Sequence, residues 1–319
     1  MTLPRDIAGL APGDIFDDPL PSPPPGPPPF GRLDNRFMGE IPGDLVGQPA
    51  WALVSRVLPT LSQEEAIELA GFGTLWLDDR LAPDPMAKLG TGAFRLNMPR
   101  YKPVVYYEID PGRLVVSDGD IIVYDKESGP STVPAPYDAK NNLVSAMERR
   151  YCLDLRAPHR LDAATSGLVI LAVNRLAASR MGKAFQGGKV RKRYLALSRG
   201  PKPAFSETMV RAAISKRDGR YWAKEDGPGY PSQTRVTFLR SFGDDKVLFM
   251  AEPLTGRTHQ IRLHLAFLGY PIAGDRLYGG EAAPRLMLRA SGLSFRHPGT
   301  GEPLTLGGPW PEEGPSHRD

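Results

Sequence analysis

The sequence predicts an α+β protein in which a small N-terminal module precedes a larger, strand-rich body. Three observations support this class: a proline-rich start, a short capped helix followed by two alternating segments, and then many short apolar segments with only occasional helical patterns. We expect four regions, namely a disordered arm at 1–38, a small α/β module at 39–105, the main domain at 106–306 and a flexible tail at 307–319.

The composition is that of a globular protein. A chain of 319 residues, 41% hydrophobic and 24% charged, is long enough for two domains. No apolar run approaches the roughly 20 residues of a membrane helix, and the start lacks the basic and apolar segments of a secretory signal. The single cysteine, Cys152, excludes an intramolecular disulfide and fits a reducing cytoplasm. With a net charge of only +4, a polyanion would have to be met by a local basic patch.

The arm and the module have different local signals. Prolines in "LPSPPPGPPPFGR" remove backbone donors and fix an extended geometry, so we expect this segment to stay outside any core. In the module, Ser62 and Glu65 have the spacing of a capping box, which begins a short helix that ends at Gly71 or Gly73. The segments "TLWLDD" and "AFRLNM" that follow predict two short strands.

The main domain reads as strands with a few helices between them. Strands are expected at 114–116, 121–124, 168–173, 189–197, 234–239 and 247–254, and helices at 143–147, 175–186 and 259–268. Asn174 is the expected N-cap of the second helix and Thr258 that of the third. The strand "LVILAV" is apolar throughout, which indicates a central strand buried on both faces.

A dense polar cluster, "HRLDAATSG", lies directly ahead of that central strand. An isolated aspartate in a turn is most often just solvated, but Asp162 has Arg160, Thr165 and Ser166 close by in the sequence. These side chains supply donors that keep a carboxylate ionised, as a nucleophile or a base requires.

A basic strand, "KVRKRYLAL", carries a second candidate residue. Alternation places Lys192 and Tyr194 on one face and Arg191 and Arg193 on the other. Packing is the ordinary role of a strand tyrosine, and a basic run is often only a solvated edge. An aromatic ring among cations is nevertheless the combination on which flipped or single-stranded bases stack, for about 1–3 kcal/mol per base.

The helix "THQIRLHLAFLG" carries a third candidate residue. Arg262 lies at the margin of the apolar stripe, and a half-buried arginine needs a carboxylate partner, for which Asp162 is a candidate. His259 and His264 are five residues apart and face different sides of the helix. Without a cysteine cluster or a second set of ligands, this spacing argues against a metal site.

Three motifs in order, "HRLDAATSG", "KVRKRYLALSRG" and "LTGRTHQIRLHLAFLGYPIAGDRLYGG", resemble the RluA-type family of RNA pseudouridine synthases over about 110–306. The resemblance implies a mixed, largely antiparallel sheet flanked by helices. It also implies an enzyme that detaches uracil from ribose within RNA, turns it over and rejoins it through carbon 5, with no cofactor and no metal. The module at about 40–105 resembles a degenerate S4 RNA-binding domain.

The resemblance assigns roles to individual residues. Asp162 is the expected nucleophile, Arg262 its ion-pair partner, Tyr194 the ring that stacks on the target base, and Arg160 helps fill the gap left by the flipped nucleotide. The other residues expected to contact RNA are His159, Thr165, Lys192, Arg257, His259, Gln260 and Leu288. The sequence departs from the family pattern in three places: Glu127 replaces a usual proline, Arg289 a usual histidine, and Ala163–Ala164 a usual charged pair.

Other interpretations stay open at this point. A catalytically silent RNA-binding scaffold or chaperone of the same fold is one alternative, against which the complete set of Asp162, Tyr194 and Arg262 argues. A metal-dependent nuclease or hydrolase is another, disfavoured because no paired carboxylates or histidine cluster appear. The sequence does not choose between ribosomal and transfer RNA, and we expect a cytoplasmic monomer.

Overall fold

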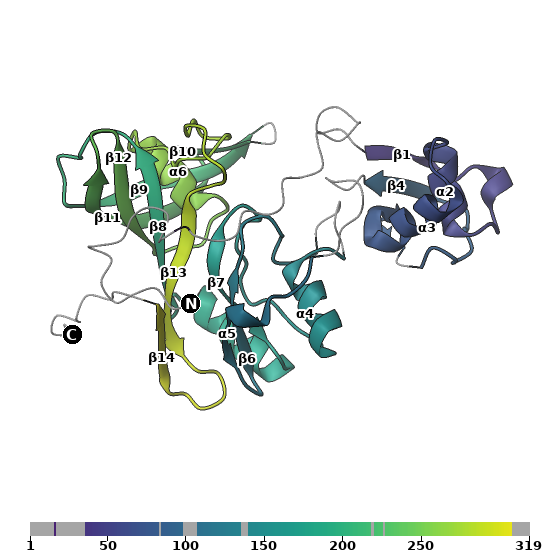
Figure 1. Cartoon of the computed structure of the whole chain (residues 1–319), viewed down its shortest axis with the longest axis horizontal. Coiled ribbons are helices and arrows are strands. Elements are labelled where there is room, and N and C mark those ends of the chain that lie inside the picture. The colour runs from purple at the N-terminus through teal and green to yellow at the C-terminus, as the bar shows by residue number, and fades with distance from the viewer. Residues whose placement is uncertain are drawn as a thin grey trace. The chain divides into compact units, whose positions relative to one another are not determined.

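The computed structural model describes residue 16 and residues 36–82, 84–97, 107–134, 140–217, 220–225 and 227–307. The chain divides into two compact units, which Figure 1 labels by element. The larger unit holds residues 1–20, 110–129 and 156–319, and the smaller unit holds 21–109 and 130–155. Residues 130–155, which the sequence analysis places in the main domain, thus group with the smaller unit. Among the described helices, none has the length and apolar character that a membrane crossing requires.

The smaller unit contains a four-stranded antiparallel sheet. Its strands are β1 (Arg36–Glu40), β4 (Ala93–Asn97), β2 (Leu75–Leu77) and β3 (Arg80–Leu81), in that spatial order. The helices α2 (Ala50–Val57) and α3 (Gln63–Leu69) share one apolar core with this sheet. The capping box of α3 is confirmed, since Ser62 and Glu65 bond to each other's backbone N–H groups. Strand β1 was missed, because it begins inside the segment assigned to the arm.

The larger unit is built on one ten-stranded sheet. Its spatial order is β10-β9-β11-β12-β8-β13-β7-β6-β5, with β14 paired to β13. Every pairing is antiparallel except that of β13 with β7, which confirms the mixed, largely antiparallel sheet. The strands are β5 (Leu114–Ser117), β6 (Ile121–Lys126), β7 (Ser166–Ala172), β8 (Arg191–Arg199), β9 (Glu207–Arg217), β10 (Arg220–Lys224), β11 (Tyr230–Phe242), β12 (Lys246–Pro253), β13 (Leu288–Arg296) and β14 (Pro303–Gly307).

Side chains cap some of the described helices, whereas α2 begins after Pro49 without such a cap. Asn142 and Asn174 cap α4 (Leu143–Tyr151) and α5 (Arg175–Gln186) by accepting from backbone N–H groups, the second as predicted. The prediction of Thr258 as N-cap of α6 (Gln260–Phe267) is wrong, because His259 is the N-cap. His259 has φ 56°, and this left-handed residue turns the chain sharply into α6.

The parallel seam between β7 and β13 depends on a glycine of the first motif. Gly167 has φ 106°, and a Cβ there would lie 2.2 Å from the carbonyl oxygen of Ala290. Only glycine adopts this conformation and allows this approach. The seam therefore fixes where β7 begins, and with it the loop that carries Asp162.

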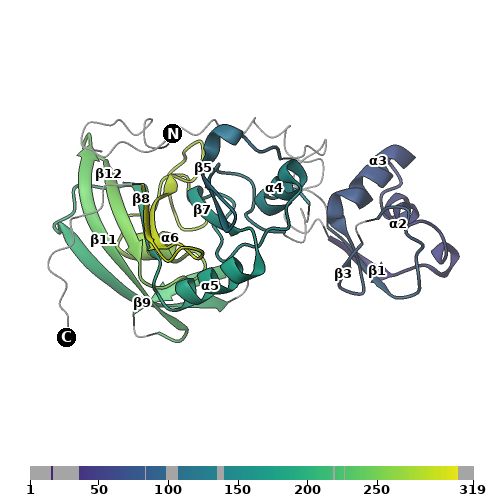
Figure 2. The ribbon, with the colours of Figure 1, turned by 90° about the horizontal axis from the view of Figure 1, so that it is seen from below.

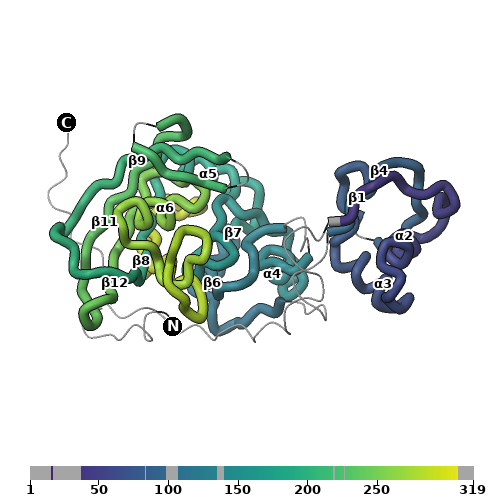
Figure 3. Tube along the Cα trace, turned by 90° about the horizontal axis from the view of Figure 1, so that it is seen from above, coloured from purple at the N-terminus to yellow at the C-terminus, as the bar shows by residue number. Residues whose placement is uncertain are grey.

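Helices α5 and α6 cover one face of the large sheet, as Figures 2 and 3 let the reader follow. Helix α6 packs with Ala196 of β8 and Phe249 of β12, whereas α5 packs with Ile170 of β7. Lys192 and Tyr194 of β8 belong to the same face by strand alternation. Phe16 is buried on the opposite face, against Leu195, Leu197 and Leu248, and the rest of the predicted arm up to residue 35 lies outside the described residues.

Candidate active site

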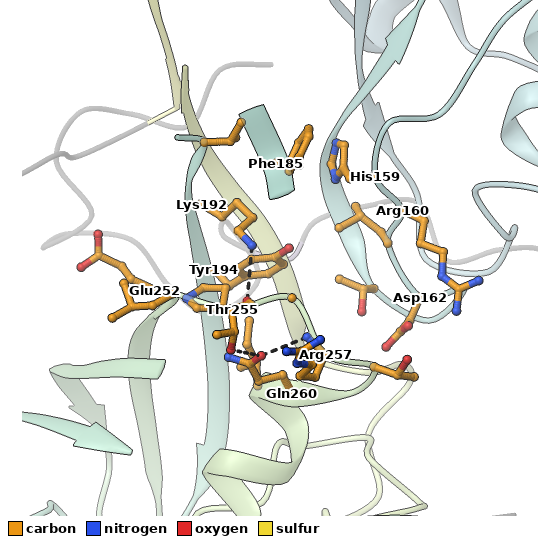
Figure 4. A pocket seen from close by; sticks show the side chains of 18 of the residues that line it. His159, Arg160, Asp162, Phe185, Lys192, Tyr194, Glu252, Thr255, Arg257 and Gln260 are labelled. Atoms are coloured by element: carbon orange, nitrogen blue, oxygen red, sulfur yellow. Dashed lines mark hydrogen bonds between the residues drawn. The ribbon is translucent and has the colours of Figure 1, made fainter. Parts of the chain in front are cut away.

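A cavity of about 720 Å³ lies on the helical face of the large sheet. Every residue that the sequence analysis named as catalytic or RNA-contacting lines it. Figure 4 shows Lys192 and Tyr194 on one side of the cavity and Arg160 and Asp162 on the other. Three segments distant in sequence thus meet here: the loop ahead of β7, the start of β8 and the turn into α6.

The loop that carries Asp162 is held mainly through its backbone. Gly129 N–H and Lys126 Nζ donate to the carbonyl of Ala163 at 2.7 and 3.2 Å, and Ser128 Oγ donates to the carbonyl of Ala164 at 2.8 Å. The Lys126 side chain is fully buried, and its ammonium also donates to the carbonyl of Glu127 at 2.7 Å. The loop is therefore rigid at the two residues that follow Asp162.

The carboxylate of Asp162 faces two nitrogen atoms from the last motif. His259 Nε2 lies 3.6 Å and Arg262 Nη1 lies 3.8 Å from Asp162 Oδ2. Thr165 and Ser166, which we expected to donate to this carboxylate, are buried, and no hydrogen bond joins their hydroxyls to it within the described chain. The structure corrects that expectation. The groups that face the carboxylate come from the start of α6, which is distant from Asp162 in the sequence.

Arg262 has a stronger partner than the one predicted. Its Nε and Nη2 donate to the two oxygens of Asp275, each at 2.7 Å, and Asp275 is buried. Burial by itself lowers the pKa of Arg262, but the hydrogen bonds and charge of Asp275, followed by the charge of Asp162, raise the pKa overall. Arg262 is thus a fixed cation between two carboxylates. Asp275 was missed, although it lies in the quoted segment "GYPIAGDRLYGG".

Tyr194 and Lys192 point toward the cavity from β8. Burial, and then the negative charge of Asp162, raise the pKa of the Tyr194 phenol, so the ring stays neutral. Burial lowers the pKa of Lys192, whose Nζ donates to the carbonyl of Thr255 at 3.4 Å. A neutral aromatic plane beside a cation is suited to hold a base next to a phosphate.

Two of the residues expected to bind substrate also hold the framework of the cavity. The Gln260 amide oxygen accepts from Thr255 Oγ1 and from Arg257 N–H, and its nitrogen donates to Gln233 and Thr234 of β11. His159 Nε2 accepts from the N–H of Ile170 at 2.9 Å, and its ring stacks on Phe185 at 4.3 Å. Burial lowers the pKa of His159 to about 3, so it is a neutral anchor between the loop and β7.

Two of the departures from the family pattern, Glu127 and Arg289, have side-chain partners in the structure. Glu127 Oε1 lies 3.1 Å from Arg113 Nε and accepts from the Tyr124 hydroxyl at 3.2 Å. Arg289 forms a buried ion pair with Asp125. Both side chains therefore take part in local ion pairs, outside the set of residues that line the cavity.

One group of described residues, Asp118, Asp120 and His297, has the spacing to hold a metal ion. Its polar atoms are used within the fold, however. Asp118 Oδ1 accepts from the N–H groups of Asp120 and Ile121, Asp120 accepts from Asn174, and His297 Nδ1 accepts from Gly299 and Thr300. These hydrogen bonds give the three residues a structural role at the N-terminal end of β6.

Comparisons with known proteins agree with this geometry. The family model described as RNA pseudouridylate synthase matches residues 120–267. The dual-specificity RNA pseudouridine synthase RluA of Salmonella typhimurium is 32% identical over 203 residues, which cover 60% of this chain and 90% of that protein. The ribosomal large subunit pseudouridine synthase C of Vibrio vulnificus is 31% identical over 63% of this chain and 66% of its own.

A solved structure is similar as well. Human RNA pseudouridylate synthase domain containing 1 superposes with a TM-score of 0.52 at 28% identity, covering 64% of this chain and 87% of that one. Sequence and structure thus lead to the same group of enzymes, and the chain belongs to the RluA-type family of RNA pseudouridine synthases.

Proposed function

We propose that this RNA pseudouridine synthase modifies uridine in structured ribosomal or transfer RNA, with Asp162 as its nucleophile. The observation that carries the proposal is the meeting of Asp162, Tyr194 and Arg262 in one cavity from three separate segments. The relatives named for activity on the ribosomal large subunit, or for dual specificity, support the substrate class.

The proposed reaction gives each residue a distinct task. Uracil leaves carbon 1′ of the ribose, turns within the cavity and rejoins through carbon 5. Whether Asp162 attacks the sugar or the base, the reacting form is the carboxylate, and Arg262 Nη1 lies 3.8 Å from its Oδ2. Tyr194 supplies the plane on which the loose uracil stacks while it turns.

Access to a uridine in folded RNA requires that the nucleotide leave its stack. Extrusion costs a few kcal/mol, which contacts in the pocket offset. Arg160 is exposed at the cavity edge beside Asp162, and we propose that it fills the gap left in the RNA helix. Lys192 lies on the opposite side of the cavity, and the exposed Arg257 lies next to Gln260. Their charges are placed to meet the phosphates on either side of the target.

The deciding experiment maps pseudouridine in total RNA from the source cell with and without the gene. Complementation uses the wild type, Asp162→Asn and a matched control, Asp244→Asn, in the exposed turn between β11 and β12. We expect one or more sites to depend on the gene, to return with the wild type and the control, and to stay unmodified with Asp162→Asn. Modification by Asp162→Asn at the wild-type rate contradicts the proposal.

Purified protein separates catalysis from binding. Asp162→Asn keeps the shape of the site, so RNA affinity should stay within about tenfold while turnover is lost. Tyr194→Ala should lower both affinity and turnover, because it removes about 1–3 kcal/mol of stacking, whereas Tyr194→Phe keeps the ring and should retain affinity. An Asp162→Asn protein that loses RNA binding as well would assign the residue a structural role.

We also propose that the enzyme works in the cytoplasm as a monomer and needs neither cofactor nor metal. The exposed thiol of Cys152 suits a reducing compartment. Full turnover in excess chelator, and a single species of monomer mass in sedimentation, are the expected results. The alternative of a silent RNA-binding scaffold is not favoured by the comparisons.

A further inference from the structure

His259 lies between the proposed nucleophile and a tyrosine to which no role has been given. Its Nε2 is 3.6 Å from Asp162 Oδ2, and its Nδ1 is 2.7 Å from the hydroxyl oxygen of Tyr278. The two ring nitrogens therefore face different groups, one on each side. What the imidazole presents to Asp162 depends on which of the two nitrogens carries the hydrogen.

The two neutral tautomers differ sharply in this setting. With the hydrogen on Nδ1, the ring would donate to Tyr278 and turn the lone pair of Nε2 toward a carboxylate, which is repulsive. With the hydrogen on Nε2, Tyr278 donates its hydroxyl hydrogen to Nδ1, and an N–H group faces Asp162. Only the second tautomer gives a favourable contact at both ring nitrogens of His259.

The protonation of the two rings agrees with the second arrangement. Burial, as the largest cause, lowers the pKa of His259, although the charge of Asp162 opposes it. Burial raises the pKa of Tyr278 to about 12, so the phenol keeps the hydrogen that it donates. Histidine and tyrosine are thus both neutral at physiological pH.

The surroundings restrict the motion of this pair. His259 has a left-handed backbone at the start of α6, and its ring meets Tyr221 and Tyr278 edge-on at 5.5 and 5.6 Å. The guanidinium of Arg262 lies over the Tyr278 ring, 5.0 Å from its centroid. Arg262 thus contacts both ends of the arrangement, Tyr278 by stacking and Asp162 by charge.

We propose that Tyr278 is a positioning residue that holds His259 in the tautomer with hydrogen on Nε2, so that a neutral N–H group and the Arg262 cation both face Oδ2 of Asp162. This inference rests on the proposed role of Asp162. Its consequence is that Oδ2 is the restrained oxygen and Oδ1 the one directed to substrate. A neutral donor orients the carboxylate of Asp162 without adding a second full positive charge. A second positive charge would make this carboxylate a poorer nucleophile.

Nitrogen NMR of histidine-labelled full-length protein tests the tautomer without any reference to activity. Two other histidines serve as internal standards for the two tautomers, because backbone N–H groups donate to one ring nitrogen of each. His159 accepts at Nε2 and so carries its hydrogen on Nδ1, whereas His297 accepts at Nδ1 and so carries its hydrogen on Nε2. We expect His259, assigned by its loss in His259→Asn, to match the pattern of His297. A match to His159 overturns the proposal.

Tyr278→Phe tests the role of the hydroxyl. The ring stays over Arg262, but Nδ1 loses its donor, so the His259 signals should shift toward a tautomer mixture. We expect kcat to fall roughly three- to tenfold, the worth of one hydrogen bond, with KM unchanged. His259→Asn should show a similar fall, since asparagine tolerates the left-handed backbone but lacks the ring donor. An unchanged kcat and unchanged signals in Tyr278→Phe overturn the proposal.

A matched control, Tyr270→Phe, and the variant Asp162→Asn distinguish a failure of the positioning role from a failure of the proposed function. Tyr270→Phe removes a hydroxyl from a tyrosine that packs against Phe205 and Phe249, and both its NMR pattern and its kcat should equal those of the wild type. Asp162→Asn tests the nucleophile itself. If Asp162→Asn is inactive while Tyr278→Phe is normal, the positioning role fails and the proposed function stands. If Asp162→Asn is active, the proposed function fails.

Discussion

At the scale of single residues, Arg262 depends on Asp275 more than on Asp162. Two hydrogen bonds of 2.7 Å join Arg262 to Asp275, whereas 3.8 Å separates it from Asp162. Asp275 is also buried, so neither partner is satisfied by water if the other is removed. The ion pair therefore sets where the arginine charge lies in the candidate active site.

Asp275→Asn should damage both stability and catalysis. It leaves the guanidinium buried with its main charge partner gone, which costs about 3 kcal/mol or more in the free energy of unfolding. Urea unfolding measures this loss, and single-turnover kinetics on RNA should show a slower chemical step. Asp244→Asn, exposed in a turn, is the control. Equal unfolding midpoints for the two variants contradict the account.

His159 should make stability depend on pH. Burial lowers its pKa to about 3, far below the usual value of about 6.5. Between these values the unfolded chain takes up a proton and the folded protein does not. The stabilisation from a neutral His159 is therefore complete above about pH 6.5 and is lost as the pH falls toward 3, by roughly 2 kcal/mol near pH 5.

His159→Gln removes this titration and provides the test. The variant should be less stable than the wild type at neutral pH, because its ring no longer stacks on Phe185. Near pH 5 the difference in unfolding free energy should narrow by about 2 kcal/mol. Urea unfolding at both pH values measures it, and His264, also buried, titrates equally in both proteins. A constant difference would show that His159 is not the titrating group.

Single residues also show how far sequence can lead. Asp162, Tyr194 and Arg262 were predicted as a set, and the structure places all three on one cavity. Asp275 and Tyr278 were missed as partners, since a bidentate ion pair or a ring contact depends on how a loop returns to the sheet. The hydrogen bonds of the Gln260 amide could not be predicted for the same reason: the strand atoms that it contacts lie 26 and 27 residues away.

At the scale of elements, local patterns were reliable where one chemical signal dominates. The apolar run of β7, the asparagine cap of α5 and the capping box of α3 were all predicted correctly. The start of α6 was misplaced by one residue, because a left-handed His259 is an unusual N-cap. The order of strands in the sheet does not follow from these patterns, since pairing depends on contacts between distant segments.

Gly167 links the pairing of two strands to the position of the loop that carries Asp162. An alanine there would force its Cβ against Ala290 at the β7–β13 seam, in a backbone conformation that only glycine tolerates. We expect Gly167→Ala to lower the free energy of unfolding by at least 2 kcal/mol and to displace Asp162, with a large loss of turnover. Gly182→Ala in α5 is the control, since open space surrounds that position. It should be neutral or stabilise by up to about 1 kcal/mol.

At the scale of the whole molecule, the two faces of the large sheet have different roles. One face lines the cavity, and the other packs an apolar cluster. Tyr194 points to the cavity side, and its neighbours Leu195 and Leu197 belong to an apolar cluster on the other side. Phe16, far away in sequence, completes that cluster and is only 3% exposed. Phe16 thus packs on the same strand that carries Tyr194.

Phe16→Ala should therefore destabilise the larger unit without changing the site. Removing a buried phenylalanine costs about 3 kcal/mol where the cavity does not collapse, so the unfolding of this unit should shift to lower urea. At low temperature, where the unit stays folded, kcat and KM should remain those of the wild type, because the lost contact lies on the opposite face. Met38→Ala, at a position 67% exposed in the smaller unit, is the matched control. Hydrogen exchange resolved along β8 assigns the effect: faster exchange at Leu195 and Leu197 in Phe16→Ala supports a direct contact, and unchanged exchange there contradicts it.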